Sequence, residues 1–304
     1  MTAPLLLSLP CPAKINLYLE IRGKRDDGFH ELGTLFQAVE AGDTLSAEPW
    51  DTITLHGADG LTDTPEDNLI VKAARLLQAR HPERVPRHAG IRFMLEKRLP
   101  SGAGLGGGSS DAAAALRLTN AIWNVNLPSS ALIALGAELG SDVPFFLAPT
   151  PTAYGEGRGE RLEPAPAPPD FHVVIATPHC RVETPWAYRE AERYRQDMLG
   201  GEFGTTWREF RRAYATQAGR RAFYTSLRND FEAPVMAGFP EIRAVRDALN
   251  EHAPVKTMLS GSGASVFALF DEARTAQTAA EALAPRCRFA VKTSFVPPPP
   301  VPRT

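Results

Sequence analysis

Apolar residues recur along this chain with two different spacings, and each spacing predicts a different kind of element. Alternation with a period of two runs through Asn16–Glu20, and β-branched, aromatic and leucine residues fill the segments around it, as is typical of strands. Residues 69–80 instead repeat apolar side chains at helical spacing behind the capping residue Asn68. A turn is predicted at Gly42–Asp43. The predicted strands are 5–9, 15–22, several within 32–56, 91–97, 171–176, 266–270 and 289–295, and the predicted helices are 69–80, 109–123, 131–139, 184–194, 240–252 and 272–283.

A proline-rich segment at 164–169 marks the predicted boundary between two domains. The sequence there reads Pro-Ala-Pro-Ala-Pro-Pro, and the composition of the chain changes around it. A chain of 304 residues is long enough for two such domains. Because the predicted elements of the second half close with β-α-β, we expect an α+β sandwich there. The predicted domains are therefore residues 1–164 and 165–304.

Charge and cysteine content exclude several classes of function. The formal net charge of −2 gives no basic footprint for nucleic acid. The three cysteines are odd in number and far apart, so we expect reduced thiols in a cytoplasmic protein instead of a disulfide framework or a metal site. No run approaches the roughly 20 apolar residues that span a membrane, and the short apolar start has no positive segment ahead of it. We therefore expect neither a membrane nor a nucleic acid as partner.

The most informative stretch is LPSGAGLGGGSSDAAAAL at 99–116, which leads a glycine loop into a helix. Five glycines fall within 102–108, and Ser109, Ser110 and Asp111 are residues that start helices. A glycine loop before a helix N-terminus offers unpaired N–H groups to a phosphate, although a plain tight turn is the alternative. The P-loop pattern is excluded because no lysine precedes Ser109, and the dinucleotide pattern because no acidic residue follows about 20 positions on. The prediction is a nucleotide phosphate site.

Two further segments each allow a functional and a structural interpretation. Asp142 lies between a helix end and the apolar Pro144–Phe146, so it is either a turn residue or a partly shielded catalytic carboxylate. Phe29 and His30 follow a polar turn, where they are either surface residues or a stacking ring with a hydrogen-bond donor for a planar ligand. Residues 196–228 are rich in arginine and show no recognisable site chemistry.

Three separated motifs resemble the signatures of the GHMP kinases, the superfamily of galactokinase, homoserine kinase and mevalonate kinase. They are Pro-Ala-Lys-Ile-Asn at 12–16, the glycine-serine loop at 102–110 and Ser-Gly-Ser-Gly-Ala at 260–264. Within the superfamily, PAKINLYLEIRGKRDDGFHEL, EDNLIVKAA, SDVPFF, YGEGRGE and LSGSGASVFALF look like the branch that phosphorylates the 2-hydroxyl of a cytidyl diphosphate ester of methylerythritol. The resemblance implies an α+β fold, with an N-terminal α/β nucleotide-binding domain, a C-terminal α+β sandwich domain and an active site in the cleft between them. The remaining alternatives are another small-molecule kinase, of the homoserine or phosphomevalonate type, and a non-catalytic binding protein of the same fold.

The same resemblance implies roles for individual residues. Asp142 matches the general base that takes the proton of the attacked hydroxyl, and Lys14 matches a cation that keeps this carboxylate ionised. Phe29 stands where the family often has tyrosine, so stacking on cytosine is kept while a phenol hydrogen bond is lost. The ATP-binding residues it implies are Asn68, Leu69, Lys97, Pro100, Gly102, Gly104, Leu105, Gly106, Gly107, Gly108, Ser109 and Ser110. The substrate-binding residues it implies are Asn16, Phe29, His30, Tyr188, Arg189, Ser262, Gly263 and Ala264.

The implied reaction also sets expectations about cofactors and assembly. ATP is the phosphate donor, and Mg²⁺ is expected to bridge its phosphate oxygens, with no protein residue assigned as a metal ligand. The expected partners are ATP and a small cytidyl diphosphate substrate. A monomer or a weak homodimer is expected.

Overall fold

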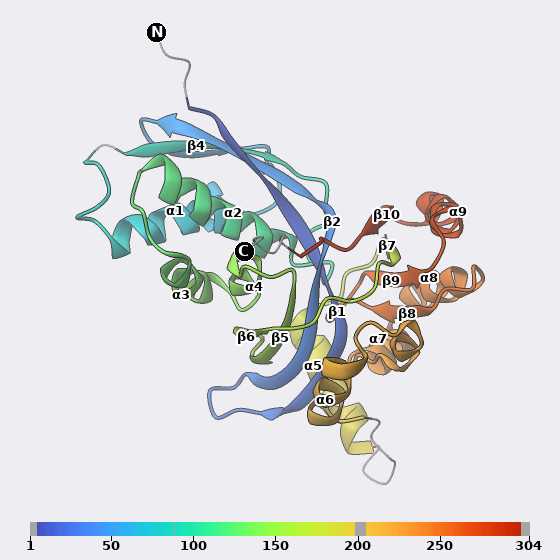
Figure 1. Ribbon diagram of the computed structural model, residues 1–304. Helices are drawn as coiled ribbons and strands as arrows, with labels where there is room; N and C mark the ends of the chain where they lie inside the picture. The colour runs from blue at the N-terminus through green and yellow to red at the C-terminus, as the bar shows by residue number, and fades with distance from the viewer. Residues whose placement is uncertain (1–4, 88, 198–204, 299–304) are drawn as a thin grey trace, which may run out of the picture. The chain divides into compact units, whose positions relative to one another are not determined.

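The first two strands of the chain, β1 (Leu7–Lys24) and β2 (His30–Trp50), are long and pair with each other. They are joined by a turn in which the backbone N–H of Arg25 donates to the carbonyl oxygen of Phe29 at 2.8 Å. The computed structural model describes residues 5–87, 89–197 and 205–298 (Figure 1). Both strands contribute to each of the two units into which the chain divides.

These two units do not follow the order of the chain. The first contains the described residues of Met1–Ala13, Gly42–Ser101 and Gly106–Pro149, and the second those of Lys14–Ala41, Gly102–Leu105 and Thr150–Thr304. The predicted boundary divides the chain once, between residues 164 and 165. The chain of the structure instead passes back and forth between the two units several times. The boundary stays a prediction.

The first unit packs helices against a small sheet. In its strand order β3–β4–β2, residues Thr44–Trp50 of β2 pair antiparallel with β4, and β3 pairs parallel with β4. The helix α1 packs on α2, and α3 contacts both, with all of them on one side of these strands (Figure 1). Asn68 begins α1 as predicted, because its Oδ1 accepts the N–H of Ile70 at 3.0 Å. The elements of this unit are β3 (Ile53–His56), η1 (Pro65–Asp67), α1 (Leu69–Arg80), β4 (Gly90–Glu96), α2 (Gly107–Ile122), α3 (Ser129–Leu139) and α4 (Val143–Leu147).

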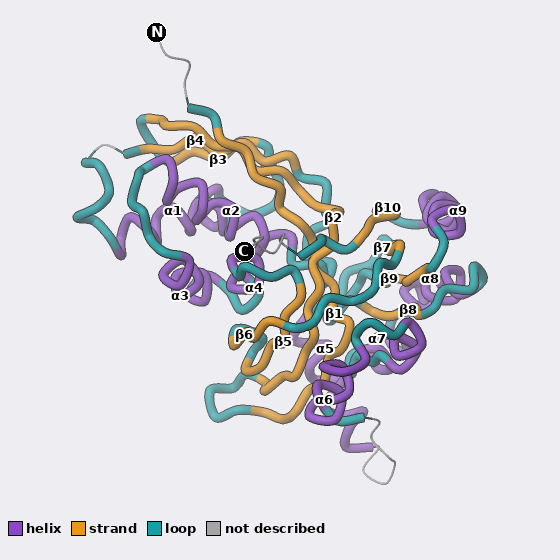
Figure 2. The backbone as a smooth tube through the Cα atoms, in the orientation of Figure 1, coloured by secondary structure: helices purple, strands orange, loops and turns teal. Residues whose placement is uncertain are grey.

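The second unit contains a hairpin and a four-stranded antiparallel sheet. Residues Leu32–Gln37 of β2 pair with β5, which forms the hairpin with β6. The separate sheet has the order β10–β7–β9–β8, and helices α8 and α9 pack against it (Figure 2). The bounds are β5 (Thr152–Gly157), β6 (Arg161–Pro164), β7 (His172–Thr177), α5 (Thr184–Asp197), α6 (Trp207–Gln217), η2 (Arg221–Ser226), α7 (Glu232–Gly238), α8 (Pro240–Asn250), β8 (Lys256–Leu259), β9 (Val266–Phe270), α9 (Ala273–Leu283), η3 (Ala284–Arg286) and β10 (Phe289–Ser294).

The structure corrects the predicted turn at Gly42–Asp43, which is wrong because β2 runs through both residues. Gly42 is needed there for close approach between strands, since a Cβ would lie 2.3 Å from the carbonyl oxygen of Cys11. The predicted strands 5–9 and 15–22 form the single strand β1, which contains Pro10 and Pro12. In the part of the chain that the structure describes, no helix combines the length and the apolar character needed to cross a membrane.

Candidate active site

The glycine loop uses positive backbone angles at three of its five glycines. Gly102, Gly104 and Gly106 have φ of +61°, +77° and +69°, a region that residues with a Cβ rarely adopt. A Cβ on Gly104 would also lie 2.1 Å from the carbonyl oxygen of Ser260. Gly107 and Gly108 instead form the first turn of α2. The high glycine content therefore serves both a loop with positive φ angles and an open helix end.

The start of α2 offers backbone N–H groups without a capping side chain. Its N-cap is Gly106 in the left-handed conformation, so no side chain satisfies the first N–H groups of the helix. A Cβ built on Gly108 meets no atom within 4 Å, which leaves the space beside this turn open. Unpaired N–H groups at the positive end of a helix form a site for an anion.

The helix begins earlier than Ser109 and Ser110, which the sequence predicted as its starting residues. A serine cap is not required because glycine takes the left-handed N-cap conformation without steric cost. Ser109 and Ser110 lie within the first turn, and Ser110 is buried with its Oγ lacking a hydrogen-bond partner among the described residues.

Beside this turn, a lysine ammonium is buried between two carboxylates. Lys97 Nζ donates to Asp43 Oδ2 at 2.6 Å and to Asp111 Oδ2 at 2.8 Å. Asp43 Oδ1 also accepts the backbone N–H groups of Arg98 at 2.6 Å and Leu99 at 2.8 Å. Asp43 therefore fixes the turn that leads into the glycine loop, and Lys97 links this turn to α2.

The groups of this cluster shift one another's pKa values. Burial raises the pKa of Asp111 to about 6, although the Lys97 ammonium opposes that shift. Burial alone would lower the pKa of Lys97, but the charges and hydrogen bonds of Asp111 and Asp43 outweigh it and raise that pKa. Burial also raises the pKa of the Cys11 thiol, and the negative charges of the two aspartates act in the same direction. Lys97 is held as a cation and Cys11 as a neutral thiol.

The buried cluster changes the interpretation of Lys97, which the resemblance assigned to an adenosine pocket. Its side chain is only 15% exposed, and its donors serve two carboxylates. The structure thus shows that Lys97 joins Asp43 to Asp111, and its contact with adenosine stays a prediction. Asn68 likewise uses its side-chain oxygen to cap α1, while Leu69 and Pro100 are half-buried.

In the second unit, segments from all three sequence motifs meet. The backbone N–H of Lys14 donates to the carbonyl oxygen of Leu105 at 2.9 Å. Ser260 Oγ donates to the carbonyl oxygen of Gly104 at 2.9 Å, and the N–H of Ser265 donates to that of Ala103 at 3.1 Å. Residues separated by about half of the chain therefore build one backbone framework.

A chain of hydrogen bonds orients the side chain of Lys14 within this framework. Lys14 Nζ donates to Asn16 Oδ1 at 2.8 Å, and Asn16 Nδ2 donates to Thr34 Oγ1 at 2.8 Å. Thr34 in turn donates to the carbonyl oxygen of Tyr18 at 2.7 Å. Lys14 is 5% exposed and Asn16 is 2% exposed, so the ammonium is held in a fixed direction. The sequence did not predict the part of Thr34 in this hydrogen-bond chain, because a threonine in a strand has no distinguishing pattern.

Asp142 belongs to the first unit, where it is the N-cap residue of the short helix α4. It is half-buried, and its side chain makes no capping hydrogen bond to that helix. Its pairing with Lys14 and its role as a base stay predictions.

The residues predicted to bind a cytidyl group are only partly brought together. The rings of His30 and Tyr188 are stacked, with centroids 4.3 Å apart and planes 14° apart. His30 Nε2 lies 2.6 Å from Glu192 Oε1. Phe29 is 51% exposed, and the guanidinium of Arg158 lies 4.7 Å from its ring centroid. His30, not Phe29, is the ring next to Tyr188.

Other predicted substrate residues lie on α5 and on the loop after β8. Arg189 is exposed, and Ser262 Oγ is 3.2 Å from Thr184 Oγ1 at the start of α5. Gly263 and Ala264 are buried, and their contact with a ligand stays a prediction. Asn229 Nδ2 supports this loop by donating to the carbonyl oxygens of Leu259 at 2.9 Å and Gly261 at 2.8 Å.

Comparison with known proteins gives this geometry a family. Residues 68–149 match the GHMP kinases N terminal domain, and residues 215–287 match the GHMP kinases C terminal domain. The 4-diphosphocytidyl-2-C-methyl-D-erythritol kinase of Salinibacter ruber is 39% identical over 288 residues, which are 92% of this chain and 95% of that protein. The kinase of the same name from a Synechococcus species is 40% identical, covering 94% of each chain. The chain belongs to this family of GHMP kinases.

Solved structures agree with this assignment. A crystal structure of a 4-(cytidine 5'-diphospho)-2C-methyl-D-erythritol kinase has a TM-score of 0.77 and 35% identity, covering 95% of this chain and 99% of that one. Homoserine kinase from Cytophaga hutchinsonii reaches a TM-score of 0.69 at 17% identity, with 97% of this chain and 96% of its own covered. At that identity the second likeness shows the fold alone. The predicted α+β fold of the GHMP kinases is confirmed.

Proposed function

We propose that this GHMP kinase transfers the γ-phosphate of ATP to the 2-hydroxyl of 4-diphosphocytidyl-2-C-methyl-D-erythritol, giving the 2-phosphate and ADP. The observation that carries the proposal is the high identity to kinases of that name along nearly the whole chain. The alternatives, a homoserine or phosphomevalonate kinase and a non-catalytic binding protein, are not favoured.

The nucleotide phosphates are proposed to lie at the start of α2. The backbone of Gly104–Ser109 supplies N–H donors there, and the open space beside Gly108 admits the phosphate oxygens. Phosphoryl transfer needs positioning and charge neutralisation more than covalent chemistry, so a rigid set of donors is suited to it.

Asp142 and Lys14 are proposed to act on the substrate hydroxyl. The Asp142 carboxylate takes the hydroxyl proton while the hydroxyl oxygen forms a bond to the γ-phosphorus, and the bond from that phosphorus to the β–γ bridging oxygen breaks. The Lys14 ammonium, oriented by Asn16, stabilises the negative charge of the transferring group. Asn16 is proposed to lie near the same hydroxyl.

Magnesium is proposed to enter with ATP. Among residues 5–87, 89–197 and 205–298, no group of three or more His, Cys, Asp or Glu side chains could hold a metal ion. Mg²⁺ commonly binds through substrate phosphates and water with one or two carboxylates, so a protein cage is not required. The ion would neutralise phosphate charge, while the N–H donors of α2 orient the phosphates.

The cytidyl group is proposed to bind beside the β1–β2 turn. Phe29 supplies an exposed ring, and the His30–Tyr188 stack supplies polar atoms and a second aromatic surface. Arg189 and the backbone of Ser262–Ala264 are proposed to contact the diphosphate. We also propose a cytoplasmic enzyme, since its three cysteines are free thiols.

The substrate assignment is tested by coupled ADP release. The purified chain is assayed with ATP, Mg²⁺ and either the cytidyl substrate, homoserine or mevalonate. We expect turnover with the cytidyl substrate alone. Turnover with one of the other alcohols, or with none of the three, would contradict the proposal.

The Phe29→Ala variant tests the cytidyl site. We expect KM for the cytidyl substrate to rise about tenfold, because loss of a stacking ring costs about 1–3 kcal/mol per base. Steady-state kinetics should show KM for ATP unchanged. Tyr194→Ala removes another exposed aromatic ring and is the control. An equal rise of both KM values in Phe29→Ala would remove Phe29 from this site.

The Gly108→Ala variant tests the phosphate site. Because a Cβ at this position meets nothing within 4 Å and alanine favours a helix by about 0.5–1 kcal/mol, stability should be kept or increased. We expect KM for ATP to rise about tenfold nonetheless, since the methyl group occupies the space proposed for phosphate. Gly219→Ala also fits without contact and should change neither property. A wild-type KM for ATP in Gly108→Ala would place the phosphates elsewhere.

A further inference from the structure

The helix α6 carries a stripe of arginines that the kinase reaction does not use. Arg208, Arg211 and Arg212 stand at helical spacings of three and four, followed on the same face by Ala215. The opposite face buries Trp207, Phe210 and Tyr214. Like charges at these spacings destabilise a helix by a few tenths of a kcal/mol, so an isolated α6 gains nothing from this arrangement.

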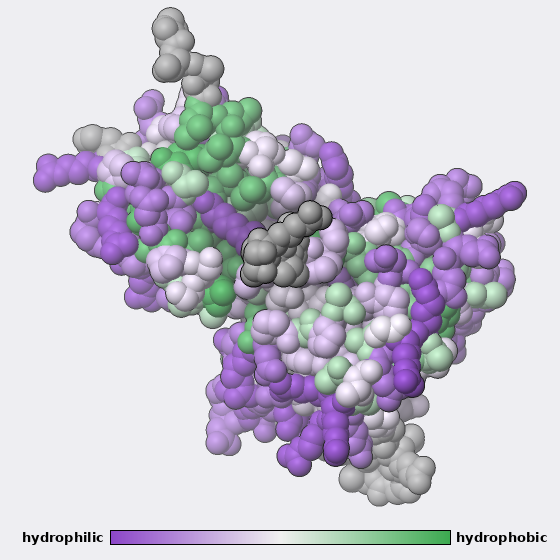
Figure 3. Space-filling view, viewed as in Figure 1, coloured by the Kyte–Doolittle hydropathy of each residue, from purple (hydrophilic) through white to green (hydrophobic). Residues whose placement is uncertain are grey.

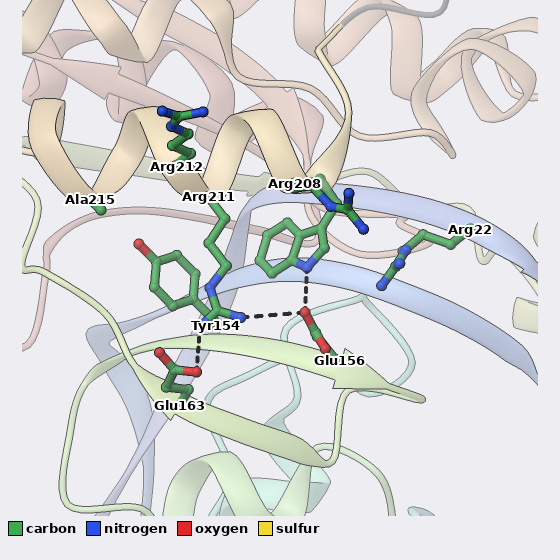
Figure 4. Close-up of a pocket in the computed structure, with 9 residues that line it drawn as sticks. Arg22, Tyr154, Glu156, Glu163, Arg208, Arg211, Arg212 and Ala215 are labelled. Atoms are coloured by element: carbon green, nitrogen blue, oxygen red, sulfur yellow. Dashed lines mark hydrogen bonds and ion pairs between the residues drawn. The ribbon is translucent and has the colours of Figure 1, made fainter.

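This stripe lines a pocket of about 590 Å³ together with residues from β1, β5 and β6. Figure 4 shows Arg22 reaching from β1 toward the end of the pocket where Arg208 lies, while Arg211 lies near Tyr154 and two glutamates. The surface around the β1–β2 turn and α6 is predominantly hydrophilic (Figure 3). The pocket volume is in the range of small-molecule sites.

The acidic groups around the pocket already have partners. Glu163 pairs with Arg211, and Glu156 accepts from the indole N–H of Trp207 at 2.8 Å and pairs with Arg211 at 3.5 Å. Glu209 is used in the capping box with Thr206 at the start of α6.

Another carboxylate near the start of α6, that of Glu20, is also occupied. Glu20 Oε2 accepts from the hydroxyl of Tyr18 at 2.9 Å and from the backbone N–H of Trp207. Within the described ranges, Arg22, Arg208 and Arg212 therefore line the pocket without an ion pair. The guanidinium groups of Arg22 and Arg208, which come from two separate elements, lie at the same end of the pocket (Figure 4).

We propose that this pocket binds a small anion with two linked phosphate groups, such as a diphosphate or a diphosphate ester. Guanidinium groups present paired donors that match phosphate oxygens, and a diphosphate supplies enough negative charge for several of them. A hollow of this volume fits a small molecule, and the net charge of −2 argues against a nucleic-acid surface. This site is additional to the proposed kinase site and does not depend on that proposal.

The test is calorimetric titration of the full chain with inorganic pyrophosphate, in the presence of a saturating non-hydrolysable ATP analogue. The analogue occupies the glycine loop, so it removes competition from that site. We expect one equivalent of pyrophosphate to bind, and Arg22→Ala and Arg208→Ala each to weaken its binding about tenfold. The exposed Arg220, which does not line the pocket, provides the control variant Arg220→Ala, expected to bind as wild type.

Parallel titrations with ADP and with inorganic phosphate show whether the pocket accepts a diphosphate ester, only a free diphosphate, or a single phosphate. We expect ADP to bind if a diphosphate ester is accepted and to fail if only the free diphosphate fits, with inorganic phosphate weaker than both. If an alanine variant does not fold, Arg22→Lys or Arg208→Lys keeps the charge and should still weaken binding, because it loses the paired donors.

Four outcomes would overturn the proposal. Three of them are absence of binding to the wild-type chain, wild-type affinity in either Arg22→Ala or Arg208→Ala, and equal weakening in Arg220→Ala, which would indicate general surface attraction. Displacement of pyrophosphate by a single-stranded oligonucleotide would also overturn it. The kinase assay is read separately, so failure to phosphorylate the cytidyl substrate leaves the calorimetric result unaffected.

Discussion

Replacing Asp142 with asparagine is expected to lower kcat by about 10³-fold while the protein stays folded. The substitution keeps the shape of the side chain and removes only the charge that accepts the hydroxyl proton, and general-base catalysis contributes about 10²–10⁴-fold. Stability should be little changed, because asparagine keeps the size of the side chain and Asp142 is only half-buried. The measurement is ADP release at saturating ATP and cytidyl substrate, with thermal unfolding as the check on folding.

Asp59→Asn is a suitable control, since Asp59 is exposed in a loop of the same unit. It should retain wild-type kcat. A near-wild-type kcat in folded Asp142→Asn would mean that another group accepts the proton.

Replacing Lys97 with methionine is expected to lower the free energy of unfolding by about 3–5 kcal/mol. The change leaves the Asp43 and Asp111 carboxylates buried without their shared cation, and breaking a buried ion pair from one side has a cost of this size. Urea denaturation at pH 7 measures the loss. Lys72→Met provides the contrast, because Lys72 is half exposed and its pair with Asp67 at 3.4 Å should be worth at most about 1 kcal/mol.

The loss of unfolding free energy in Lys97→Met is expected to depend on pH. The pKa of Asp111 in the folded protein is raised by burial to about 6, above the roughly 3.9 of an aspartate in an unfolded chain, so the folded state binds a proton more readily than the unfolded chain. Protonation removes the unpaired charge, and the deficit of Lys97→Met should therefore shrink as the pH falls from 7 to 5. A variant with wild-type stability and only a raised KM for ATP would instead assign Lys97 to adenosine.

Much of the fold was predictable because its signals are local. The helix 69–80 is preceded by its capping residue Asn68. The glycine-serine loop indicates the start of α2 to within three residues. The prediction of a turn at Gly42–Asp43 was wrong. A glycine next to an aspartate is typical of turns, but here the glycine lies in a strand and permits close contact with the backbone of Cys11. That contact joins residues about thirty positions apart, and no local pattern reports it.

In the candidate site, too, the sequence motifs were predictable and the contacts between distant residues were not. Motif spacing identified the segments around Lys14, the glycine loop and Ser260, and the structure brings segments of these motifs together in the second unit. The partnership of Lys97 with Asp43 and Asp111 was missed, because it joins a strand, a strand end and a helix. The arginine stripe was visible in the sequence, but only folding reveals which carboxylates are already occupied.

Because β1 and β2 contribute to both units, fragments of this protein that lack these strands are expected to misfold. A fragment that starts at residue 165 would lack Leu19, whose backbone exchanges hydrogen bonds with Arg228 and Asp230 at 2.9 and 3.0 Å. Such a fragment, expressed alone, should be insoluble or degraded, and co-expression with residues 1–164 should rescue it. Truncations of this kinase will therefore need to keep β1 and β2, and split-protein reporters cut after these strands will need both pieces to be expressed together.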